Sequence, residues 1–142
     1  MQITTVGLDI AKNLFQVHGA DAQGRVLLKR KLARSKVLEF FATLPACLVG
    51  LEACGAAHYW ARELTKLGHE VRLIPPVYVK PFVRRHKNDA ADAEAIAEAA
   101  SRPSMRFVAL KSEDQQAQAM LFRTRDLLVR QRTQLVNALR GH

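Results

Sequence analysis

Four acidic residues stand where the sequence pattern ends a strand or begins a helix. Asp9 and Glu52 each close a short apolar run of strand character. Asp89 and Asp92 open an alanine-rich segment, and their spacing of three places both on one face of a helix. Strand and helix ends are where open α/β sheets place their sites, so the four carboxylates form one candidate site.

Carboxylates that meet at one point repel one another unless cations hold them. The usual partners are one or two hard divalent ions with oxygen ligands, which also serve phosphoryl transfer. We therefore predict Mg²⁺, or Mn²⁺, at Asp9, Glu52, Asp89 and Asp92. Taken singly, each acid also has a structural interpretation, as an exposed loop residue or as a helix-dipole stabiliser.

The chain of 142 residues is strongly basic, with a net charge of +9. This length predicts one domain plus an extension, and the charge indicates a polyanionic partner, with nucleic acid the first candidate. The alternative is a basic but unrelated protein, either ribosomal or merely soluble. The basic residues that we expect to contact phosphates are Lys12, Lys29, Arg30, Lys31, Arg34, Arg84, Arg85 and Lys87.

Other patterns argue against several protein classes. Cys47 and Cys54 form no CxxC pair, which indicates small core residues in a reducing compartment. The five histidines lack the spacing of a zinc site. We see no charged-then-apolar leader and no apolar run long enough to span a bilayer, so we expect a cytoplasmic protein without a membrane partner.

Strand and helix signals alternate along the first two thirds of the chain. They predict strands at 3–10, 13–20 and 25–32, a helix at 36–44 capped by Ser35, a strand at 46–52, a helix at 55–66 and a strand at 70–74. The first three strands suggest an antiparallel meander, and the later strand, helix and strand suggest a parallel crossover. Together they predict a mixed central sheet flanked by helices.

A helix is predicted at 89–101. Ile96 shares the face of Asp89 and Asp92, so we expect that face to point inward. Glu94 and Glu98 fall nearly opposite and are expected in solvent.

A second, longer helix is predicted at 113–140, a stretch without glycine or proline that follows a capping start at Ser112. Leu121, Leu128 and Leu135 recur with a period of seven, which favours a projecting helix that pairs as a coiled coil. The alternative is a helix packed on its own domain.

Three motifs, GLDIAK, GLEACG and KNDAADA, occur in this order around the four acids. In this order they resemble the N-terminal domain of the DEDD-type insertion-sequence transposases, the bridge-RNA-guided recombinases. The resemblance implies a ribonuclease H-like (RuvC-like) catalytic domain over 1–111, with the four acids binding magnesium. It also implies a dimerising coiled coil that begins at 112–142, and a further C-terminal domain with a DNA-attacking serine, before which we expect this chain to stop.

The leading prediction is therefore the N-terminal catalytic domain of a transposase or recombinase that cleaves and rejoins DNA with divalent metal. The resemblance implies DNA, a structured guide RNA and a second copy of the chain as partners, in a bacterial cytoplasm and on the nucleoid when DNA is bound. Two alternatives remain: a RuvC-like endonuclease of Holliday junctions, and a non-enzymatic nucleic-acid-binding module.

Overall fold

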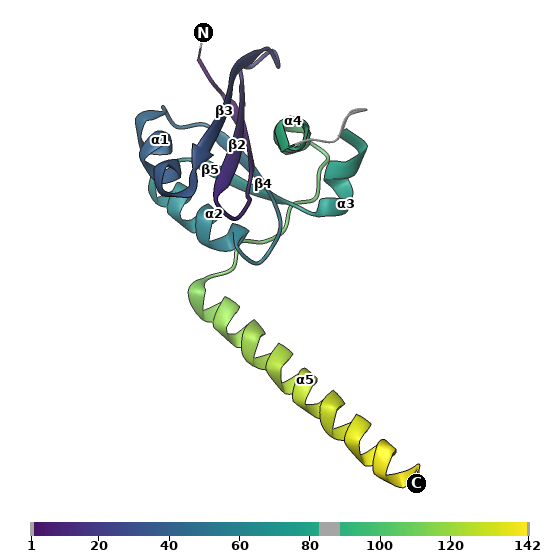
Figure 1. Ribbon diagram of the computed structural model, residues 1–142. Helices are drawn as coiled ribbons and strands as arrows, with labels where there is room; N and C mark the ends of the chain where they lie inside the picture. Colours follow the sequence, from purple (N-terminus) through teal and green to yellow (C-terminus); the bar gives the residue numbers. More distant parts are fainter. Residues whose placement is uncertain (1, 83–88, 142) are drawn as a thin grey trace. The chain divides into compact units, whose positions relative to one another are not determined.

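The computed structural model describes residues 2–82 and 89–141, and for Asp89 it describes the backbone alone. The chain divides into two compact units, Met1–Leu110 and Lys111–His142. The first unit holds a sheet and its covering helices, and the second is formed by one long helix (Figure 1).

In the described residues, one mixed sheet has the strand order β3-β2-β1-β4-β5. The strands are β1 (Thr5–Asp9), β2 (Leu14–Ala20), β3 (Val26–Ala33), β4 (Leu48–Glu52) and β5 (Glu70–Ile74). β2 pairs antiparallel with β1 and β3, whereas β4 pairs parallel with β1 and β5. This is the strand order of a ribonuclease H-like sheet. The predicted fold class is confirmed, together with its opening meander and its parallel crossover.

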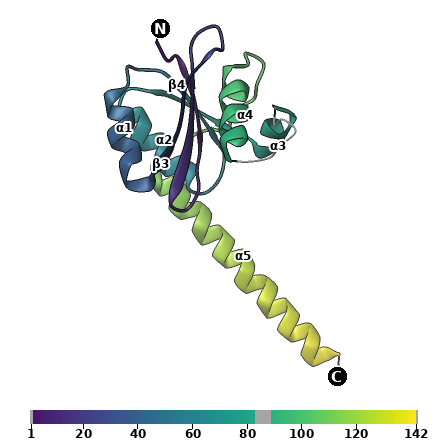
Figure 2. The ribbon, with the colours of Figure 1, turned by 45° about the horizontal axis from the view of Figure 1, so that its top comes forward.

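Helices cover both faces of the sheet (Figure 2). One face carries α1 (Val37–Thr43) and α2 (Ala57–Lys66), and the other carries α3 (Pro76–Val79) and α4 (Asp89–Ser101). The bounds of α4 agree with the predicted helix 89–101. A 3-10 turn, η2 (Lys80–Phe82), follows α3.

The predicted cap at Ser35 is wrong. Ser35 lies inside a 3-10 turn, η1 (Arg34–Lys36), that leads into α1. The N-cap position of α1 therefore falls on Lys36, whose side chain makes no capping hydrogen bond. The 3-10 turn moves the start of the α-helix one residue beyond the predicted start.

Alternation along the strands separates two apolar cores. Val6 and Leu8 of β1 are fully buried in the core that α1 and α2 close, where Trp60 also packs. The opposite face packs against α4, with Ile74 and Ile96 at the centre of the second core. Intervening strand residues such as Gly7 thus face α4, because successive side chains of a strand point to opposite faces.

The second unit consists mainly of α5 (Glu113–Arg140), as predicted. Its N-terminus is closed by a capping box: the Gln115 backbone N–H donates to Ser112 Oγ at 3.2 Å, and the Ser112 backbone N–H donates to Gln115 Oε1 at 2.9 Å. No described residue of α5 is buried. Among the helices that the structure describes, none is long and apolar enough to cross a membrane.

Candidate functional site

Asp9 and Glu52 end two neighbouring parallel strands. The register pairs Leu8 of β1 with Leu51 of β4, so the next residue on each strand is one of the two acids. Both acids are half-buried. Because Leu8 and Leu51 face α1 and α2, alternation places Asp9 and Glu52 on the face that α4 covers.

Two glycines allow α4 to lie directly against this face. A β-carbon on Gly7 would stand 2.6 Å from the backbone nitrogen of Ala97, and it would also collide with the carbonyl oxygen of Ala93. A β-carbon on Gly50 would stand 2.6 Å from the β-carbon of Ala100. The helix therefore crosses β1 and β4 where neither strand carries a side chain.

The same contacts give the direction of α4. Thr5, at the start of β1, lines a cavity together with Ser101, the last residue of α4. Two residues further along β1, Gly7 meets Ala93, near the start of α4. The helix runs antiparallel to β1, so its first turn lies toward the strand ends that carry the acids.

Helix positions 89 and 92 lie one turn before the residues that cross Gly7 and Gly50. Four helix residues advance about 6 Å, and two strand residues advance about 6.6 Å. The two positions therefore come level with the two strand-end acids. Asp92 is half-buried, whereas the side chain of Asp89 lies outside the described residues.

The donor set at this edge consists of carboxylates, which is the chemistry that Mg²⁺ and Mn²⁺ prefer. Within the described part of the chain, no three His, Cys, Asp or Glu side chains form a group that could hold a metal ion. Asp9, Glu52 and Asp92 thus share an edge without closing on a single point. The site therefore suits a divalent ion by its ligand type alone.

Gln16 belongs to the same edge and was not predicted. It pairs with Asp9 across β1 and β2, and with Lys31 across β2 and β3. Residues paired across strands face the same side, so Lys31, Gln16 and Asp9 form one row on the α4 face. Gln16 is 7% exposed. The sequence did show a polar residue between the apolar Phe15 and Val17, which could have marked Gln16 as a site residue. Only the strand register, however, connects Gln16 with Asp9.

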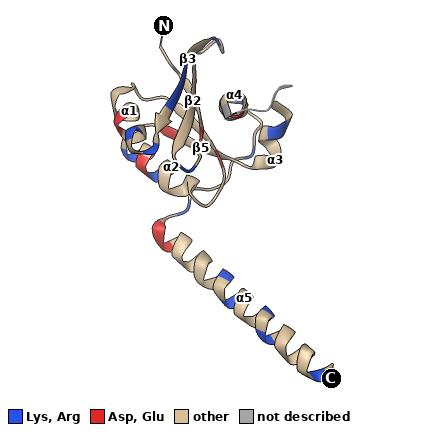
Figure 3. Ribbon diagram, viewed as in Figure 1, with Lys and Arg blue, Asp and Glu red and all other residues tan. Residues whose placement is uncertain are grey.

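The predicted phosphate-binding residues divide between the two faces. Lys29 and Lys31 are exposed and belong to the α4 face, because each pairs with a β2 residue that faces α4. Arg30 instead lies over the ring of Phe40 at 5.5 Å, on the α1 side. Figure 3 shows this basic stretch of β3 in blue.

The remaining predicted basic residues lie elsewhere. Arg34 lies over the ring of Trp60 at 5.4 Å, also on the face of α1 and α2. Lys12 is exposed in the loop after β1. Arg84, Arg85 and Lys87 lie outside the described residues.

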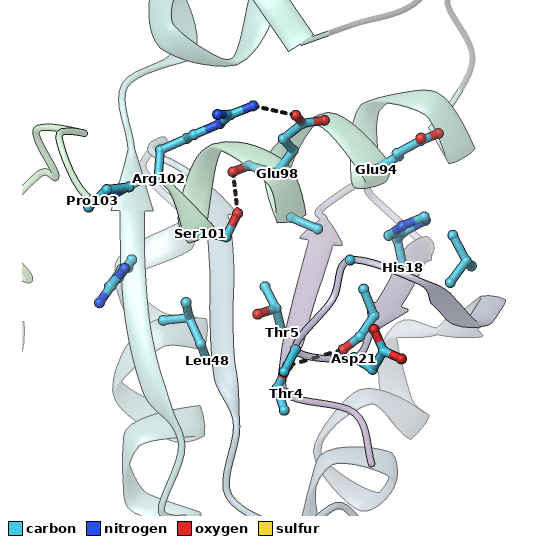
Figure 4. Close-up of a pocket in the computed structure, with 16 residues that line it drawn as sticks. Thr4, Thr5, His18, Asp21, Leu48, Glu94, Glu98, Ser101, Arg102 and Pro103 are labelled. Carbon is cyan, nitrogen blue, oxygen red and sulfur yellow. Dashed lines mark hydrogen bonds and ion pairs between the residues drawn. The ribbon is translucent and has the colours of Figure 1, made fainter. Parts of the chain in front are cut away.

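Glu94 and Glu98 correct a prediction, because both are half-buried rather than in open solvent. They line a cavity of about 740 Å³ between α4 and the starts of β1 and β4, where Figure 4 shows Glu94 beside His18. Arg102 Nη2 donates a hydrogen bond to Glu98 Oε1 at 2.6 Å, which completes an ion pair. α4 packs against β2 as well as against β1 and β4, a contact that the helical spacing alone could not reveal.

His18 is buried in this cavity, at 4% exposure. Among the described residues, its Nδ1 atom has no hydrogen-bond partner. Burial lowers the pKa of His18 below its ordinary value of 6.5; Glu94 acts to raise it and Lys29 to lower it further. The imidazole is therefore neutral at pH 7.

The sheet has the ribonuclease H-like strand order, and an acid ends each of two neighbouring parallel strands, β1 and β4. These features define the first unit as a ribonuclease H-like domain. Residues 6–142 match the sequence family of the IS110-type DEDD transposases, described as transposase. The chain belongs to this family, and the resemblance to the DEDD-type insertion-sequence transposases is confirmed.

Named relatives agree with the family. A protein of Pseudomonas aeruginosa named as a probable family 20 transposase is 58% identical over 99% of this chain and 42% of its own length. The transposase for insertion sequence element IS1328 of Yersinia enterocolitica is 47% identical over 96% of this chain and 41% of its own length. The chain thus spans about two fifths of these relatives.

A solved structure, T. thermophilus RuvC in complex with a Holliday junction substrate, aligns with a TM-score of 0.48 and 14% identity. The alignment covers 76% of this chain and 100% of that one.

Proposed function

We propose that this chain is the N-terminal catalytic part of a transposase that cleaves and rejoins DNA with divalent metal ions, guided by a structured RNA. The observation that carries the proposal is the edge shared by Asp9 and Glu52, beneath the first turn of α4. Membership of a transposase family supports the same function. The DNA partner would place the protein in the bacterial cytoplasm.

Asp9, Glu52, Asp89 and Asp92 would hold Mg²⁺ or Mn²⁺ at this edge. The ion would offset negative charge on the phosphate and lower the pKa of an attacking hydroxyl. The chain's own residues would bind and orient the substrate: exposed Lys29 and Lys31 would contact backbone phosphates on the side of the sheet that carries the acids.

The proposed arrangement divides the chain into a catalytic domain over 1–111 and the start of a coiled coil over 112–142. Leu121, Leu128 and Leu135 are 70%, 58% and 64% exposed, which leaves an apolar stripe along α5. Pairing with a second copy would remove this stripe from water, at about 25 cal/mol for each Å² buried. We therefore propose a homodimer formed through α5.

Metal binding and cleavage test the catalytic proposal separately. Calorimetric titration with Mn²⁺ is expected to show binding to the unmodified chain and a loss of at least about 10-fold in affinity for Asp9→Asn or Glu52→Gln. Glu63→Gln, an acid of α2 that pairs with Lys66, is the matched control and should bind as the unmodified chain does. Equal Mn²⁺ affinity in all variants would contradict metal binding at Asp9 and Glu52. A separate assay, the metal-dependent cleavage of labelled DNA, measures the reaction itself.

A further inference from the structure

A groove opens beside Tyr59, on the α2 side of the first unit. Its volume is about 610 Å³, and the residues that line it include Asn13, Arg34, Ser35, Tyr59 and Trp60. We refer to it as the Tyr59 groove. Tyr59, Asn13 and Ser35 are used by none of the interactions described above for the acidic edge.

The Tyr59 groove lies at the same edge of the sheet as the strand-end acids. Asn13 follows Asp9 by four residues, in the loop that leads into β2. The Asn13 carbonyl accepts a 2.9 Å hydrogen bond from the Arg34 backbone N–H, which joins the start of β2 to the end of β3. Tyr59 lies in the first turn of α2, the helix that follows Glu52. The acids lie on the α4 side of this edge and the groove on the α2 side, so a nucleic-acid strand bound at the acids would pass around the edge of the sheet to reach the groove.

Tyr59 offers a positioned aromatic surface. Its ring meets that of Trp60 edge-on, with 5.2 Å between centroids and 78° between planes. Tyr59 is 42% exposed, whereas Trp60 is 4% exposed and anchored in the core. The contact with Trp60 holds the tyrosine while the rest of its surface remains open. Aromatic side chains placed in this way stack with unpaired bases regardless of base type.

Arg34 places a positive charge in the same groove. Its guanidinium packs over Trp60, which holds the long side chain by a cation–π contact, and the residue stays exposed. Guanidinium groups bind phosphate oxygens through paired hydrogen bonds. Asn13 and Ser35, both exposed, add an amide and a hydroxyl suited to a base edge or a sugar. An aromatic surface, a guanidinium and neutral polar groups together match a nucleotide.

We propose that the Tyr59 groove binds one unpaired nucleotide of the nucleic acid that is processed at the acidic edge. Its base stacks on Tyr59, and its phosphate contacts Arg34. The inference rests on the proposed function, because it takes nucleic acid as the substrate. It adds a second contact for the strand at the same edge of the sheet, which orients the backbone for reaction.

Trp60 is the only tryptophan of the chain, so its fluorescence reports on the groove directly. The experiment titrates the chain with a short oligothymidylate, a short oligouridylate and a blunt duplex without unpaired bases. We expect a single strand to quench Trp60 and the duplex to leave it unchanged. Tyr59→Ala should weaken single-strand binding about 10-fold, and Tyr59→Phe should retain it. Tyr78→Ala removes a tyrosine of similar exposure, 41%, from α3, and should have no effect.

Salt dependence separates stacking from phosphate contact. Arg34→Ala should lower the slope of log affinity against log salt by about one, and Tyr59→Ala should leave that slope unchanged. A preference for the thymidylate or the uridylate strand would assign the bound nucleotide to DNA or to RNA, and either supports the groove. If the chain binds no nucleic acid at all, the proposed function fails with it. If it binds nucleic acid but Tyr59→Ala matches Tyr78→Ala, or Tyr59→Phe is as weak as Tyr59→Ala, the groove proposal alone is overturned.

Discussion

Gly7 and Ala97 approach so closely that a β-carbon on the glycine would stand 2.6 Å from the alanine's backbone nitrogen. We expect Gly7→Ala to destabilise the first unit by about 3 kcal/mol, because the neighbouring atoms are backbone and cannot turn aside. Chemical denaturation measures the change. Gly55→Ala is the control: a β-carbon there meets nothing within 4 Å, so its unfolding midpoint should match that of the unmodified chain. Equal midpoints for both variants would show that α4 does not depend on this contact.

Leu128 tests the pairing of α5. Leu128→Asp would place a charge in the exposed apolar stripe, and we expect sedimentation to show a dimer for the unmodified chain and a monomer for the variant. Thr133→Asp adds the same charge nearly on the opposite side of the helix, at 100° per residue, and should remain dimeric. An unmodified chain that sediments as a monomer at high concentration would contradict the coiled-coil proposal.

His18 predicts a pH dependence of stability. Its pKa is below 6.5 in the folded chain, because burial disfavours the charged form. Between that lowered value and 6.5, the unfolded chain binds more protons than the folded chain. The free energy of unfolding should therefore fall as the pH drops below 6.5, by up to about 1.4 kcal/mol for each pH unit. The same denaturation series on His18→Gln should lose part of this slope, and an unchanged slope would exclude His18 as its source.

The two cysteines should differ in reactivity. Burial raises the pKa of the Cys47 thiol to about 11, so this thiol stays protonated at pH 8, whereas Cys54 is exposed. Iodoacetamide at pH 8 should modify Cys54 in the folded chain and reach Cys47 only after denaturation. Mass spectrometry of the modified peptides measures both rates, and equal rates in the folded chain would contradict the buried position of Cys47.

Local signals were sufficient for most elements of the fold. The bounds of α4 and α5 were predicted because alanine-rich segments and segments without proline favour helix over strand or turn. The capping box at Ser112 also marks the start of α5. Strand ends at Asp9 and Glu52 were visible in the apolar pattern. Local signals failed at Ser35, because this residue lies inside the 3-10 turn that precedes α1 and so does not cap the helix.

The arrangement of the site depends on contacts between distant segments. Gln16 joins Asp9 only through the pairing of β1 with β2. Arg30 and Lys31 are adjacent in sequence but face opposite sides, so charge alone could not separate them. Glu94 and His18 line one cavity because α4 also packs against β2, a contact that helical periodicity does not predict.

The two acid-bearing strands repeat one four-residue pattern, Val-Gly-Leu followed by an acid, and pair residue against residue. In each copy the valine and leucine are buried, the glycine admits α4, and the acid ends on the face of α4. Inserting or deleting a single residue within either copy would exchange the two faces, since side chains alternate along a strand. A carboxylate would then enter the apolar core and a leucine would meet the backbone of α4. The length of these two tetrapeptides is therefore as constrained as the glycine and the acid that each contains.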